Sequence, residues 1–127
     1  MSSLLLHHCP NGGSRNKAEA VKLKQMGVKA GIPDLCLPVP MGMYNGLYIE
    51  MKYDTGRLED SQKKMLKALA AAGHYCTVCY GAEEAIRVLQ EYINLKKIDT
   101  GNREDAMSEQ NLMIRKNGKV KCIIFKE

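Results

Sequence analysis

Three residues occupy positions from which they could do chemistry together. Glu50 and Lys52 lie two positions apart in the run Leu47–Lys52, whose composition and flanking turn residues predict a β-strand. Side chains two apart on a strand leave the same face of the sheet. A carboxylate and an ammonium on one buried face need an explanation, because such groups are rarely buried unless they are paired or bind a metal. Asp34 directly follows Pro33 and begins the preceding short strand, which is expected to pair with Leu47–Lys52 as a hairpin.

Pairing of these strands would bring Asp34 close to Glu50. Two neighbouring carboxylates repel each other, and a divalent cation removes that cost; hard oxygen ligands favour Mg²⁺, with Mn²⁺ as a substitute. Lys52 would then lie beside the water on the metal, where it could orient or help to deprotonate that water, or offset charge on a phosphate. The chemistry indicated is metal-dependent hydrolysis of a phosphodiester. From these three residues alone, a salt bridge between Glu50 and Lys52 explains the pattern equally well.

Turn residues and apolar periodicity predict a mixed α/β order around a small sheet. Four strands are expected in the main part of the chain, over Leu4–Cys9, Asp34–Leu37, Leu47–Lys52 and His74–Tyr80. Three helices are expected, over Lys17–Met26, Asp60–Ala72 and Glu83–Lys96. Gly27 and Gly73 follow the first two helices as candidate stops. In the third helix Ile86, Leu89 and Ile93 are expected to form the packing stripe.

The C-terminal region predicts a separate hairpin. Leu112–Lys116 and Lys119–Phe125 flank Asn117-Gly118, a strong type I′ turn signal. Because a two-stranded hairpin is only marginally stable alone, it is expected to dock on the core or on another subunit. The polar segment Thr100–Gln110 is expected to be a linker. The 127-residue chain is therefore interpreted as a main domain over 1–97, with the linker and hairpin of 98–127 appended to the same domain.

The charge pattern is compatible with a nucleic-acid partner. The chain has 19 Lys and Arg against 14 Asp and Glu, a net charge of +5. Basic residues gather in two stretches, Arg15, Lys17, Lys22, Lys24 and Lys29, and Lys63, Lys64 and Lys67. Such clusters suit phosphate contacts, although on charge alone a solvated helix face is the simpler interpretation. No apolar stretch reaches the roughly 18 residues of a membrane span. No membrane partner is expected, and the expected location is the cytoplasm, or the host cell interior for a viral protein.

The cysteines are expected to be reduced thiols. Their number is five, and their spacing predicts no disulfide framework. Cys76 and Cys79 resemble a redox or zinc motif, but they lie on a predicted buried strand, where positions three apart face opposite sides. A zinc site that combines them with His7, His8 or Cys9 lacks a second paired-ligand spacing.

Four segments in order along the chain resemble the VRR-NUC family, a branch of the PD-(D/E)xK nucleases, in its short stand-alone form. They are Pro10–Gly13, Gly27–Leu35, Gly46–Lys52 and Cys79–Ile86. Several motifs at matched spacing are far more specific than three residues. The resemblance implies a restriction-endonuclease-like core, with a small mixed central sheet flanked by helices, to which the C-terminal β-hairpin is added.

The resemblance also implies residue roles. Asp34 and Glu50 match the metal-binding acids, the backbone carbonyl of Met51 matches a further metal ligand, and Lys52 matches the catalytic lysine. Gln62 matches a glutamine that lines the active site from the following helix, with an exposed helix position as its simpler interpretation. Four residues are the candidate DNA contacts: Asn11, Arg15, Lys17 and Lys29. A plain turn residue explains Asn11 equally well.

The implied function is that of a Mg²⁺- or Mn²⁺-dependent, structure-specific endodeoxyribonuclease that cuts branched DNA such as four-way (Holliday) junctions as a homodimer. The family's usual helix before the first strand, with a glutamate that joins the metal site, is expected to be missing here, and Glu19 is not an aligned replacement. The alternative function is therefore a weakly active or inactive DNA-binding or assembly module with the nuclease fold.

Overall fold

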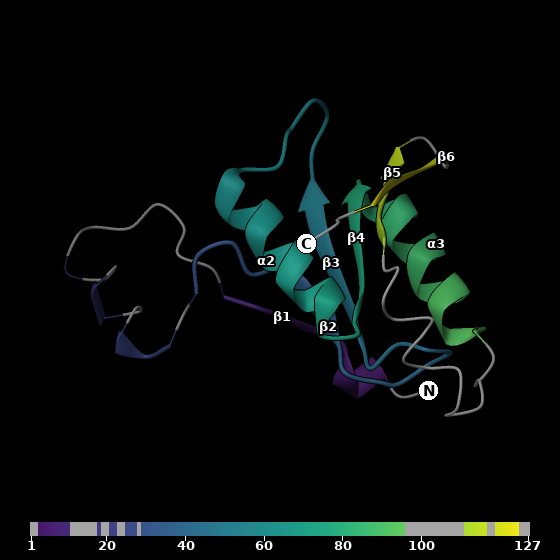
Figure 1. Ribbon diagram of the computed structural model, residues 1–127, viewed down its shortest axis with the longest axis horizontal. Coiled ribbons are helices and arrows are strands. Elements are labelled where there is room, and N and C mark those ends of the chain that lie inside the picture. Colours follow the sequence, from purple (N-terminus) through teal and green to yellow (C-terminus); the bar gives the residue numbers. More distant parts are fainter. Residues whose placement is uncertain are drawn as a thin grey trace.

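The computed structural model describes residues 3–10, 18, 21–22, 25–27, 29–95, 111–116 and 119–124. These residues form one sheet of six strands in the order β1-β2-β3-β4-β5-β6, with two helices beside it (Figure 1). The strands are β1 (His7–His8), β2 (Leu35–Leu37), β3 (Leu47–Lys52), β4 (Tyr75–Tyr80), β5 (Asn111–Lys116) and β6 (Lys119–Ile124). The helical elements are the 3₁₀ turn η1 (Ser3–Leu5) and the helices α2 (Asp60–Ala71) and α3 (Ala82–Ile93).

The sheet is mixed, as the sequence predicted. Strands β1, β2 and β3 are antiparallel neighbours, β3, β4 and β5 run parallel, and β6 returns antiparallel to β5. The hairpin of β2 and β3 pairs Leu35 with Ile49. One step further in this register, Asp34 lies opposite Glu50. Helix α2 connects the parallel strands β3 and β4, so the end of β3 leads directly into the loop before α2.

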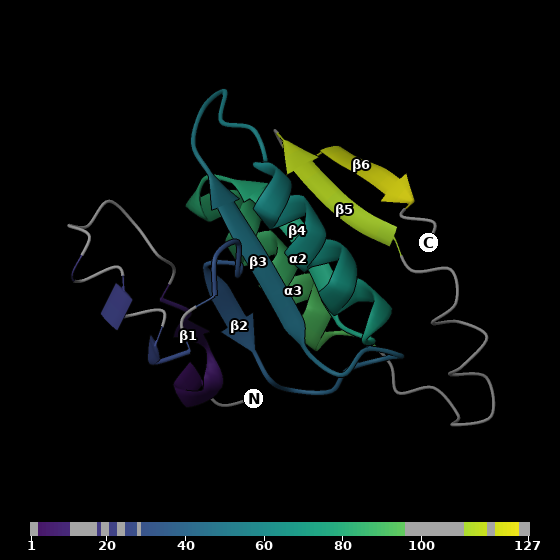
Figure 2. The same cartoon turned by 60° about the vertical axis from the view of Figure 1, so that its left-hand side comes forward.

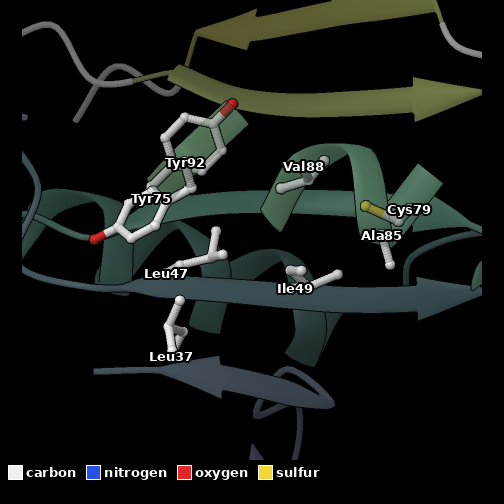
Figure 3. Packing of buried hydrophobic residues seen from close by; sticks show 8 residues of the cluster. All are labelled: Leu37, Leu47, Ile49, Tyr75, Cys79, Ala85, Val88 and Tyr92. Atoms are coloured by element: carbon white, nitrogen blue, oxygen red, sulfur yellow. The ribbon is translucent and has the colours of Figure 1, made fainter. Parts of the chain in front are cut away.

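Two apolar clusters place the helices on opposite faces of the sheet. The first joins α3 to β2, β3 and β4, and Figure 3 labels its members: Leu37, Leu47, Ile49, Tyr75, Cys79, Ala85, Val88 and Tyr92. The second joins α2 to β4 through Leu66, Ala70, Cys76 and Val78. Cys76 and Cys79 thus belong to different faces, as strand geometry predicted. All four cysteines whose side chains are described are free thiols.

Local sequence accounts for the elements around the site. Strand β4 is buried on both faces from Tyr75 to Cys79, which is typical of a central strand with parallel neighbours. Helix α2 begins with a capping box between Glu59 and Gln62, and ends before Gly73, which adopts a φ of +98°. Helix α2 is therefore delimited by a capping box at its start and by a glycine just after its end.

Two predictions were wrong in detail. The strand expected over Leu4–Cys9 is confined to His7–His8, because Ser3–Leu5 forms a 3₁₀ turn. Ile86 is 53% exposed, so it does not belong to the packing stripe of α3. The buried apolar positions are instead Ala85, Val88 and Tyr92, which follow helical spacing, with Leu89 and Ile93 partly buried beside them.

Other predictions were confirmed or fall outside the described residues, and the division into 1–97 and 98–127 stays a prediction. The C-terminal hairpin forms, and it docks on the core because β5 pairs with β4. Gly27 adopts a φ of +90°, as expected of a helix stop. Most of the helix expected over residues 17–26 and the whole linker over 100–110 lie outside the described residues. None of the helices described is long and apolar enough to cross a membrane.

Candidate active site

Asp34 lies at the start of β2, where the polypeptide enters the sheet. Its Oδ2 accepts a hydrogen bond of 2.8 Å from the backbone N–H of Met51 on β3. In an extended strand the N–H and C=O of one residue point to the same side. The carbonyl of Met51 is therefore directed toward the side on which Asp34 lies, beyond the last pair that β2 forms with β3.

Glu50 is the most unusual residue of the site, because it is a carboxylate that is only 2% exposed. Its Oε1 accepts a hydrogen bond of 3.1 Å from Gln62 Nε2. Its Oε2 is buried and accepts a hydrogen bond from no donor among the described residues. Burial, and next the negative charge of Asp34, raise the pKa of Glu50 to about 7, although Lys52 acts in the opposite direction. Among the described residues, no donor therefore satisfies this buried carboxylate oxygen.

Lys52 projects from the same face of β3 as Glu50. Its Nζ donates a hydrogen bond of 2.8 Å to Gln62 Oε1 and lies 3.8 Å from Glu50 Oε1. The longer separation is an ion pair without a direct hydrogen bond. The salt bridge that the sequence left open as an equally good explanation therefore exists, but it does not satisfy Glu50 Oε2.

Gln62 joins these groups from the first turn of α2. Its Oε1 accepts from Lys52 Nζ and, at 2.9 Å, from the backbone N–H of Glu59, while its Nε2 donates to Glu50. An ammonium can only donate and an ionised carboxylate can only accept, so the two neighbours fix the orientation of the amide. The glutamine is half-buried rather than exposed, and it holds both charged groups of β3.

A close contact between backbones places α2 beside Asp34. A Cβ on Gly31 would lie 2.4 Å from the carbonyl oxygen of Ser61, and Gly31 adopts a φ of +80°. Only glycine fits both conditions. The segment that ends in Asp34 can therefore approach the first turn of α2, where Gln62 lies. The sequence analysis missed Gly31, because its loop gave no sign of which element it would touch.

The described residues offer oxygen ligands for a hard cation. Asp34 and Glu50 supply carboxylates, the carbonyl of Met51 lies on the same side, and Glu50 Oε2 lacks any other partner. Mg²⁺ typically takes one or two protein carboxylates and completes its octahedron with water and substrate phosphate. Among the described residues there is no group of three or more His, Cys, Asp and Glu that could hold a metal.

The candidate DNA contacts are only partly described. Lys29 is exposed, while Asn11, Arg15 and Lys17 lie outside the described residues. On α2, Lys63 and Lys64 are exposed directly after Gln62, and Lys67 is half-buried one turn later. Basic side chains therefore follow Gln62 along the exposed side of α2.

Comparison with known proteins identifies the family of the chain. The sequence profile of the VRR-NUC domain matches residues 3–83, well over half of the chain. The chain belongs to the VRR-NUC family. A solved structure described as a VRR_NUC domain protein is 40% identical, with a TM-score of 0.64 over 75% of this chain and 72% of that one. A search of curated proteins gave no match.

As a VRR-NUC protein, the chain has a nuclease-type domain with a restriction-endonuclease-like α/β fold. Asp34, Glu50, Met51, Lys52 and Gln62 all fall within the matched region. Most of α3 and the hairpin of β5 and β6 lie beyond the VRR-NUC match. DNA is the partner that a nuclease domain suggests.

Proposed function

We propose that this protein is a divalent-metal-dependent endonuclease that hydrolyses phosphodiester bonds in branched DNA, including four-way junctions, and acts as a homodimer. The observation that supports this most strongly is the buried Glu50 Oε2, which has no hydrogen-bond partner and belongs to a carboxyl group beside Asp34. A fold gains nothing from such an atom, since burial of an unsatisfied charge is costly. A cation bound between the two carboxylates supplies the missing partner and removes the repulsion between them.

In this proposal Asp34, Glu50 and the carbonyl of Met51 hold Mg²⁺ or Mn²⁺. The bound ion supplies Lewis acidity toward phosphate oxygens and acidifies water at neutral pH. Asp34 is kept in place by the N–H of Met51, and Glu50 by the amide of Gln62. The protein residues therefore fix the acids before a cation binds, so little reorganisation is needed.

Lys52 acts on the substrate side of this arrangement. Its side chain is 14% exposed, and its Nζ is held by a hydrogen bond to Gln62 Oε1. An ammonium there neutralises charge that develops on the phosphate and orients the attacking water. Positioned charges of this kind typically contribute about 100-fold or more to the rate.

The preference for branched DNA and the homodimer rest on weaker support. One site of this size cuts one strand, and the two symmetric cuts that resolve a four-way junction need two sites related by a two-fold axis. The exposed Lys63 and Lys64 beside Gln62 offer phosphate contacts next to the site.

The test is cleavage of labelled four-way junction, flap and linear duplex with Mg²⁺, Mn²⁺ or EDTA. We expect metal-dependent cleavage of the branched substrates, and a loss of at least about 100-fold in Lys52→Ala. Arg87→Ala is the matched control, because it removes one positive charge from the exposed surface of α3, on the opposite face of the sheet. It should cut like the wild type.

Two outcomes would contradict the proposal. Cleavage that persists in EDTA would rule out the metal role of Asp34 and Glu50. Folded protein that binds branched DNA but cuts with neither metal would instead support the DNA-binding or assembly module.

A further inference from the structure

Tyr53, the residue after Lys52, is left almost wholly in solvent. Its side chain is 88% exposed, whereas Tyr44, Tyr48, Tyr75, Tyr80 and Tyr92 are buried or half-buried. An aromatic ring stabilises a fold through the area it buries, and this ring buries almost none. Its position beside the candidate active site therefore has no explanation in packing.

A defined turn presents this ring. The N–H of Gly56 donates a hydrogen bond of 2.9 Å to the carbonyl of Tyr53, which closes a four-residue turn. Asp54 within it has a φ of +51°, and among the described residues it is the one non-glycine residue with a positive φ. Backbone strain of this kind persists only where the surroundings enforce it, and it is common at functional sites.

Contacts to residues of two strands hold the turn at the end of β3. The hydroxyl of Tyr80 on β4 donates a hydrogen bond of 2.9 Å to the carbonyl of Gly56. A Cβ on Gly56 would lie 3.1 Å from the carbonyl oxygen of Tyr53 and 3.4 Å from Lys52 Cδ, so the turn packs on the side chain of Lys52. The loop between β3 and α2 projects beyond the end of β3 in both views (Figures 1 and 2).

We propose that Tyr53 stacks on an unpaired base of the DNA next to the phosphate to be cut. Base stacking on an aromatic ring does not depend on sequence, because every base has a π face. In an intact duplex that face is covered by the neighbouring base pair, whereas a flap or a junction exposes it. Stacking on Tyr53 would thus select branched DNA by its structure, which deepens the proposed function and rests on it.

The test measures stacking and cleavage separately. Binding is followed with 2-aminopurine at the unpaired position of a flap, in the Glu50→Gln background so that the DNA stays uncut. We expect fluorescence quenching with Tyr53 and with Tyr53→Phe, which keeps the ring, and none with Tyr53→Ala. Tyr53→Ala should bind flap DNA about tenfold more weakly and duplex DNA unchanged. Ile86→Ala, which removes an exposed apolar side chain on α3, is the control and should change neither.

The inference fails if Tyr53→Ala binds flap as the wild type does, if it weakens duplex binding equally, or if Tyr53→Phe loses quenching as Ala does. It also fails if Tyr53→Ala changes the oligomeric state, because the ring would then be a subunit contact. Cleavage assays with Glu50 intact separate the two proposals. Quenching that depends on Tyr53 without any metal-dependent cleavage overturns the nuclease and supports the base contact, whereas normal cleavage with no effect of Tyr53→Ala overturns the base contact alone.

Discussion

At the scale of single residues, Glu50 sets a conflict between folding and function. A 2% exposed carboxyl group with one unsatisfied oxygen destabilises the folded protein when it is ionised. The same features favour a cation, since a bound metal supplies the missing partner. Active sites commonly reduce stability in this way. The free energy of unfolding should therefore differ measurably between the metal-free protein and a variant without this charge.

The first prediction concerns Glu50→Gln and the pH dependence of stability. The folded-state pKa of about 7 exceeds the ordinary glutamate pKa of 4.5, so between these pH values the folded protein holds a proton that the unfolded chain releases. The free energy of unfolding of the wild type should therefore fall, relative to Glu50→Gln, as pH rises through this window, by up to about 3 kcal/mol. Urea denaturation without metal at a series of pH values measures it.

Magnesium provides the control for this prediction. Because a metal binds the ionised carboxylate, saturating Mg²⁺ should stabilise the wild type most above pH 7 and stabilise Glu50→Gln little. Parallel pH curves for the two proteins without metal would contradict the assignment of the raised pKa to Glu50.

How far single residues could be predicted depends on the range of the interaction. Glu50 and Lys52 project from the same face of the sheet because they lie two positions apart on one strand. This was derived from the sequence alone. The hydrogen bonds of Gln62 depend on how α2 docks, so the residue was found only through the resemblance to a family. The orphaned oxygen of Glu50 depends on every neighbour that covers it, and no local pattern encodes it.

At the scale of elements, the site depends on how the segment that leads into β2, Gly31–Asp34, packs against the start of α2. Gly31 permits that contact, since it has only a hydrogen where a Cβ would meet the backbone of Ser61. This contact holds the segment from Gly31 to Asp34 against the first turn of α2. It thereby keeps Asp34 close to Gln62.

The second prediction is the effect of Gly31→Ala. The alanine needs a positive φ and would place its Cβ 2.4 Å from a backbone oxygen, so the two elements must move apart. We expect a loss of about 2–4 kcal/mol in stability and a larger proportional loss of cleavage than of DNA binding. Gly81→Ala is the matched control: Gly81 has a φ of +96° but open space around it, so it tests the backbone strain alone. Equal effects of the two variants on cleavage would argue against the packing role of Gly31.

The element predictions failed where local signals compete with tertiary context. Ile86 has the right chemistry for a core position, but the orientation of α3 is set by Ala85, Val88 and Tyr92, whose ring also packs against Tyr75. Leu4 and Leu5 predicted a strand by composition, yet they form a 3₁₀ turn at the sheet edge and remain exposed. The strands β3 and β4 were predicted well because burial and turn residues mark both of their ends.

At the scale of the whole molecule, the sheet combines the family core with an additional hairpin. The mixed order of β2 to β4 with α2 and α3 on opposite faces is the part that positions the site. The hairpin of β5 and β6 extends the sheet beyond β4, on the side away from β2. Its formation followed from one Asn-Gly turn signal, whereas its pairing partner β4 could not be derived from sequence, because strand order is a long-range property.

The last prediction concerns the proposed homodimer, in which each protomer contributes one site. A mixed dimer of a wild-type protomer and a Lys52→Ala protomer should cut only one strand of a four-way junction. On a supercoiled plasmid that extrudes a cruciform, wild-type dimers should therefore give linear product, because two strands are cut in one complex, and mixed dimers should give nicked circles. Differently tagged protomers purified in tandem supply the mixed species, and tandem-purified wild-type dimers control for the tags. Linear product from mixed dimers, or a monomeric mass for the active protein in light scattering, would contradict a two-site dimer, since one intact site per dimer then suffices for both cuts.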